Sequence, residues 1–156
     1  MFIKKIVLFA IASILISSAY AEKLEFSKYG FSINSLDSSP TSGMVQPIQM
    51  FLPPLNGFAP NVNVQIQAYN GTIKQYRKLS EEQFKQYDFT ILSIKETDNL
   101  LSLEYIGSMQ GLSLHWYAKA FKKGSHVYLV TATGTQADWE VNKEELMSNV
   151  NSFQLK

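Results

Sequence analysis

Four segments in the second half of the chain favour extended strands, and only short turns separate them. The segments are rich in apolar, β-branched and aromatic residues, and they span 89–96, 100–106, 112–121 and 126–133. The first turn, Thr97-Asp98-Asn99, consists of residues that bond their own backbone, and the turn 122–125 contains a glycine. Consecutive strands joined by such short turns pair antiparallel. The chain is therefore constrained to build an antiparallel sheet, on which the remaining elements must pack.

The first half of the chain adds shorter strand candidates. They are 24–26 and 31–33, which form a hairpin through Gly30, then 48–52 and 62–67. In 62–67 apolar and amide residues alternate, which indicates a strand with one face in water. The longest predicted loop covers 37–46.

A short helix is predicted between the two groups of strands. Ser80 and Gln83 have the spacing of a capping box, in which each side chain bonds the backbone amide of the other. The helix would run to Tyr87, with Leu79 and Phe84 pointing inward.

A second helix is predicted near the C-terminus. Asp138 is a suitable N-cap for a helix that runs to about Val150. Its expected buried stripe consists of Trp139, Leu146, Met147 and Val150. The fold class is therefore α+β, an antiparallel β-sheet with helices packed on it.

The N-terminus has the pattern of a signal peptide over residues 1–21. Lys4 and Lys5 precede the apolar run 6–16, and Ala19 and Ala21 supply the small residues that signal peptidase reads. The run is shorter than the roughly 20 residues of a spanning helix. We expect a single domain over residues 22–156 that is periplasmic or secreted.

Composition excludes several function classes. The chain has no cysteine, which removes disulfides, thiol chemistry and a bacterial lipid anchor, so no stable membrane anchor is expected after cleavage. Fourteen basic residues stand against 13 acidic ones, which does not suit a nucleic-acid binder. His115 and His126 would lie about 20 Å apart along one hairpin. We therefore predict no metal, no cofactor and no enzymatic activity.

Several segments resemble the PsbP-like superfamily, an α/β/α sandwich. They are 29–33 (YGFSI), 61–64 (NVNV), 129–133 (LVTAT) and 150–153 (VNSF). The resemblance extends over nearly all of 22–156. It implies a non-enzymatic accessory protein that binds another macromolecule, and it supplies no metal ligands for this chain.

The long hairpin 112–133 presents two faces. Leu114, Trp116, Ala118 and Ala120 form an all-apolar set, which we predict to cover the core. The other face has mixed polarity and carries Tyr117, Phe121 and Tyr128. Either a helix or loop covers this second face as well, or it is a docking surface.

The loop 51–60 is unusually apolar, with Leu55 and Phe58 near its centre. Either it packs over an edge of the sheet, or these two side chains project as a patch for a partner.

We expect an exported binding or assembly accessory protein that docks an unknown protein partner in the cell envelope. The partner-binding residues would be Leu55, Phe58, Tyr117, Phe121 and Tyr128. The alternative is a carrier of a small apolar ligand between sheet and helix, and an enzyme is the third possibility. A pocket of several hundred Å³ with apolar walls would favour the carrier.

Processing is the first testable expectation. The Ala19-Tyr20-Ala21 site predicts that the exported protein begins at Glu22. Intact-mass measurement of the exported protein checks this. A species that retains Met1 in the membrane fraction would contradict it.

Overall fold

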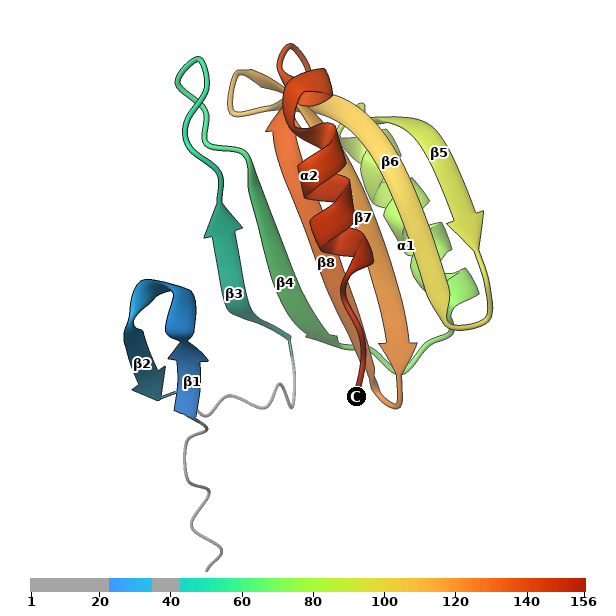
Figure 1. Cartoon of the computed structure of the whole chain (residues 1–156). Helices are drawn as coiled ribbons and strands as arrows, with labels where there is room; N and C mark the ends of the chain where they lie inside the picture. The colour runs from blue at the N-terminus through green and yellow to red at the C-terminus, as the bar shows by residue number, and fades with distance from the viewer. Residues whose placement is uncertain (1–22, 35–42) are drawn as a thin grey trace, which may run out of the picture. The chain divides into compact units, whose positions relative to one another are not determined.

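The computed structural model describes residues 23–34 and 43–156, which belong to two separate units (Figure 1). The first unit is the predicted hairpin, in which β1 (Lys23–Phe26) pairs antiparallel with β2 (Phe31–Asn34). A single 3-10 turn, η1 (Ser27–Tyr29), connects them, and Gly30 follows it with φ of 73°. The signal-cleavage residues Ala19 and Ala21 lie outside the described residues.

The second unit is a six-stranded antiparallel sheet with two helices. The strands are β3 (Met44–Phe51), β4 (Asn61–Ala68), β5 (Thr90–Glu96), β6 (Leu100–Met109), β7 (Leu112–Lys123) and β8 (His126–Thr135). Their order in the sheet is β3-β4-β8-β7-β6-β5, so β3 and β5 are the edges. The helices α1 (Ile73–Gln86) and α2 (Trp139–Asn151) lie on opposite faces of the sheet (Figure 1). The predicted α+β class with an antiparallel sheet is confirmed.

Helix α2 covers one face over β8, β7 and β4. Its buried stripe, Trp139, Leu146 and Val150, packs on Val62, Val130 and Ala132 of the sheet, and Met147 is partly buried beside them. The predicted stripe is thus confirmed. Asp138 precedes the helix, but its carboxylate makes no capping bond and instead accepts from Thr135 Oγ1 at 2.9 Å.

Helix α1 covers the other face over β5 and β6. The core beneath it contains Ile73, Leu101, Leu103, Ala120 and Val127. The predicted core set Leu114, Trp116, Ala118 and Ala120 is buried, which confirms the assignment of this face. The ring of Trp116 lies 4.9 Å from that of Phe89 and 5.0 Å from that of Tyr105.

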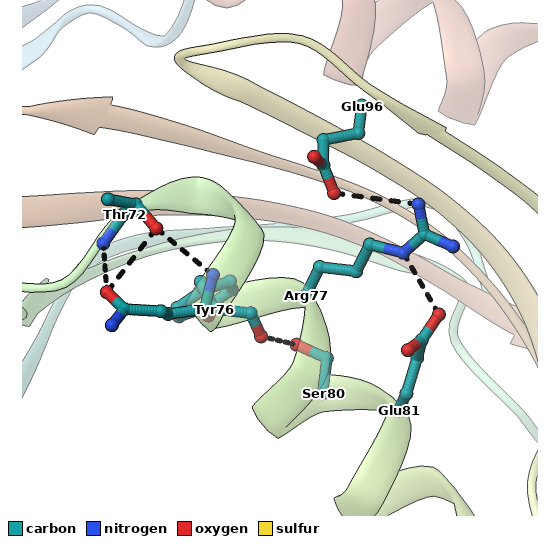
Figure 2. A network of polar contacts seen from close by, with 7 residues as sticks. Thr72, Tyr76, Arg77, Ser80, Glu81 and Glu96 are labelled. Carbon is teal, nitrogen blue, oxygen red and sulfur yellow. Dashed lines mark hydrogen bonds and ion pairs between the residues drawn. The ribbon is translucent and has the colours of Figure 1, made fainter.

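The start of α1 differs from the prediction. The helix begins at Ile73, about two turns before Ser80, because Thr72 and Gln75 form a capping box of their own (Figure 2). Ser80 lies inside the helix and donates to the carbonyl of Tyr76 at 2.9 Å. Phe84 points inward as expected, whereas Leu79 is 48% exposed.

Arg77 forms an ion pair between α1 and the edge strand β5. Arg77 Nε lies 3.0 Å from Glu81 Oε1 on the next turn, and its Nη1 lies 3.5 Å from Glu96 Oε2 at the end of β5 (Figure 2). These groups are partly exposed, so the two ion pairs contribute little to stability.

The register of the long hairpin also differs. The predicted four-residue turn 122–125 would put Phe121 opposite His126, but the loop is only Gly124-Ser125, and Phe121 pairs with Tyr128. A two-residue loop has a twist that matches the flanking strands. The shift is an even number of residues, so every side chain keeps its predicted face.

Two further corrections concern β3 and β4. Strand β3 begins at Met44, inside the predicted loop. The amide-bearing face of β4 is only partly exposed to water, because Gln65 and Gln67 are half-buried along a hollow beside α1. Tyr76 from α1 donates its hydroxyl to Gln67 Oε1 at 2.8 Å.

Removing the buried indole tests the core assignment. Trp116→Ala should lower the free energy of unfolding by about 3–5 kcal/mol, through lost burial and a cavity. Urea unfolding measures this, with Leu112→Ala as control, because Leu112 lies on the same strand and is 44% exposed. A loss below about 1 kcal/mol for Trp116→Ala would mean that this side chain is not packed as described.

The two capping patterns can be separated by mutation. Thr72→Ala should lower the free energy of unfolding by about 1 kcal/mol, because the backbone N–H of Gln75 loses its acceptor, the Thr72 hydroxyl. Ser80→Ala should be nearly neutral, since this hydroxyl bonds only a carbonyl within the helix. Urea unfolding of both variants should give that order, and the reverse order would place the helix start at Ser80.

Candidate functional site

Three of the residues predicted to bind a partner lie together on the α2 face of the sheet. Phe121 and Tyr128 are cross-strand neighbours, and both rings contact Phe153, with centroids 5.0 and 6.4 Å away. Tyr117 lies further along β7 and donates its hydroxyl to Asn151 Oδ1 at 3.0 Å. The end of α2 and the segment after it therefore cover these side chains in part.

Leu55 and Phe58 lie in a tight hairpin rather than an irregular loop. Their backbones exchange two hydrogen bonds of 2.8 and 3.0 Å around Asn56 and Gly57, which have φ of 50° and 85°. Asn-Gly at such positive φ values is typical of a type I′ turn. Both side chains are half-buried, and Asn56 Nδ2 donates to Asp138 Oδ1 at 2.9 Å.

The two groups of predicted residues do not form one site. The Leu55–Phe58 hairpin is tied to Asp138, just before α2, whereas Phe121 and Tyr128 contact Phe153, just after it. The intervening helix has 13 residues and is therefore roughly 20 Å long.

A groove on the α2 face lies beside one of these groups. It has a volume of about 540 Å³ and runs between the segment after α2 and the strands β3, β4 and β8. Its walls are mainly apolar: Ile48, Met50, Val64, Ile66, Val130, Phe153 and Leu155, together with the predicted Tyr128.

One end of the groove carries basic side chains. Lys123 and Lys156 lie at the end near the β7–β8 turn, where the Lys123 ammonium donates to the carbonyl of Lys156. A smaller hollow continues from Met50 towards Phe51, Leu52 and Glu145. No acidic side chain lines the main groove among the described residues.

The groove could have been only partly found from the sequence. Val64 and Ile66 were recognised as the apolar face of their strand, and Ile48 as part of another. The register that places Ile48 opposite Val64 depends on a bulge between Val45 and Ile48. No local sequence pattern predicts this bulge.

The two histidines lie far apart. The strand register puts His115 eight residues from Lys123, the partner of His126, or roughly 26 Å along the ladder. His115 is buried, stacks on the indole of Trp139 at 4.0 Å, and has its Nε2 2.9 Å from Glu104 Oε1. These contacts make it part of the core under α2.

A second hollow, of about 420 Å³, lies between α1 and the sheet. This is where a carrier would hold its ligand, but the walls include several amide and hydroxyl groups as well as apolar side chains. Within residues 23–34 and 43–156, no group of three or more His, Asp or Glu side chains could hold a metal ion. In the same residues, no helix has the length and apolar character needed to span a bilayer.

Comparison with known proteins identifies the fold but no family. No family model matches the chain, and no curated protein matches it. The chain is similar to the crystal structure of PA94 from Pseudomonas aeruginosa, a protein of unknown function described as a proposed regulator. The TM-score is 0.64 at 12% sequence identity, over 88% of this chain and 98% of that one. At this identity the similarity establishes a shared fold alone.

Proposed function

We propose that this protein is a non-catalytic, exported binding or assembly factor that docks an apolar segment of a protein partner in the groove beside α2. The observation that carries the proposal is the groove itself, with its apolar walls and a length of sheet that α2 leaves uncovered. The finer fold assignment, a PsbP-like sandwich, and the periplasmic or secreted location belong to the same proposal.

A side chain at the rim of the groove supports docking. Met50 lines the groove and is 40% exposed. Methionine adapts its shape to different apolar surfaces and is common at binding sites.

The charged side chains near the groove indicate which charge a bound segment should carry. Lys123 is exposed at one end, and Glu145 lines the hollow at the other. A bound segment with an acidic residue near the lysines would have complementary charge. We therefore expect the partner's bound segment to be a short apolar stretch that is flanked by an acidic residue rather than by a basic residue.

A charge placed in the groove tests the docking site. Met50→Glu should abolish capture of the partner that the wild-type protein retains from envelope extract, because a buried carboxylate would lack a counter-ion. Met109→Glu is the matched control, since Met109 is 44% exposed at the far end of the β6–β7 hairpin. Melting temperatures should stay within a few degrees for both variants. Equal capture by both would contradict the groove as the site.

The same capture assay, with a second variant, separates the groove from the hairpin at residues 55–58. Replacing Leu55 and Phe58 with serine should lower the melting temperature, because both side chains are half-buried. Any capture should remain at a temperature where the variant is folded. Loss of capture with unchanged stability would move the docking site to this hairpin.

A further inference from the structure

The hollow under α1 has an open flank because the helix covers only part of its face. Helix α1 packs on β5 and β6, where the rings of Phe84 and Tyr105 lie 4.3 Å apart. The floor of the hollow is apolar and consists of Leu103, Ala118 and Leu129 from three adjacent strands. Towards β4 the hollow is bordered by Tyr69 and Tyr76, whose rings meet edge-to-face at 5.2 Å.

Neutral polar groups surround this floor. Three glutamines line the hollow, Gln65 and Gln67 from β4 and Gln83 from α1. Burial raises the pKa of Tyr76 to about 12 and also raises the pKa of Tyr105, so both phenols keep their protons at neutral pH. Among the described residues, none that lines the hollow is charged at neutral pH.

The amides on β4 are already oriented by the protein. Tyr76 donates to Gln67, whose amide donates to Gln65 Oε1 at 3.4 Å, and Gln65 in turn donates to Gln46 Oε1 at 3.4 Å. The series continues along β3 through Gln49 to Asn61. Each amide in this row accepts through its oxygen and donates through its nitrogen, which fixes the direction of every group.

Two groups on the other side of the hollow have no such partner. The hydroxyl of Tyr105 and the side-chain amide of Gln83 form no hydrogen bond with another described residue, although both line the hollow. Tyr105 is half-buried, so its hydroxyl gains most from a partner that enters the hollow. The oriented amides of Gln65 and Gln67 thus lie across the apolar floor from the Tyr105 hydroxyl and the Gln83 amide, which can still donate and accept hydrogen bonds.

We propose that this hollow binds a neutral saccharide of one or two rings. Hydroxyl groups both donate and accept, as amides and phenols do, whereas a carboxylate only accepts and an ammonium only donates. The C–H face of a sugar ring is attracted to the negative face of an aromatic ring, and Tyr69, Tyr76 and Phe84 supply such rings. A purely apolar ligand would give the Tyr105 hydroxyl and the Gln83 amide no hydrogen-bond partner.

The volume is consistent with this ligand class. About 420 Å³ lies within the range of small-molecule sites and exceeds the volume of a single hexose. The hollow opens on the face opposite the groove, so a sugar and a docked partner can be bound together. This site is independent of the proposed docking function, and either can fail without the other.

Titration followed by backbone NMR tests the site directly. Maltose and N,N′-diacetylchitobiose serve as neutral probes, with glucuronate, glucosamine and indole as charged and apolar comparisons. We expect at least one disaccharide to shift the amide signals of α1 and β6 while those of β3 and the C-terminal segment stay in place. If neither disaccharide binds, the proposal is overturned. If indole alone binds, the alternative of a carrier for a small apolar ligand replaces it.

Two variants locate the binding groups. Tyr105→Phe removes a hydroxyl that has no described partner, so it should leave stability unchanged and weaken disaccharide binding about three- to tenfold. Gln83→Glu replaces two donors by a charge and should weaken binding about tenfold. Gln86→Glu is the matched control, because Gln86 is exposed on the same helix and does not line the hollow. Equal effects of the two glutamine variants would overturn the assignment.

Discussion

The central strands β7 and β8 are largely buried on both faces, and the rest of the structure depends on this double burial. Ala118 and Ala120 face α1, while Val130 and Ala132 face α2. Strands buried on both faces are apolar at almost every position, in contrast to strands with one wet face. At Gly134 a side chain would come within 3.1 Å of the Trp139 ring.

Each helix covers only one part of the sheet, and the uncovered parts meet at β4. Helix α1 lies over β5 and β6, and α2 lies over β8, β7 and part of β4. Val64 and Ile66 therefore line the groove on one face, while Gln65 and Gln67 line the hollow on the other. The strict alternation of this strand gives an apolar site and a neutral polar site from one stretch of sequence.

Sequence patterns predicted most elements of the fold, because strands and the α2 stripe depend on local periodicity. They failed where two nearby sequence patterns each predict a helix start, and where contacts between distant segments determine the structure. Thr72-Gln75 and Ser80-Gln83 both have capping-box spacing, and only packing of Ile73 into the core selects the first. Tyr117, Phe121 and Tyr128 were correctly placed on one face, but no local pattern could show that Phe153 folds back over two of them.

The sheet edges bear on how a partner could bind. An extended peptide can add to an unpaired edge strand, which requires a regular row of backbone donors and acceptors. In β3 that row is interrupted by Pro47, which has no N–H, and by the bulge between Val45 and Ile48. The other edge, β5, has a register shift between Ile91 and Ser93. Interruptions of this kind disfavour pairing along an edge. Recognition through side chains of the open sheet face, where Ile48 and Met50 line the groove, is therefore favoured over strand addition.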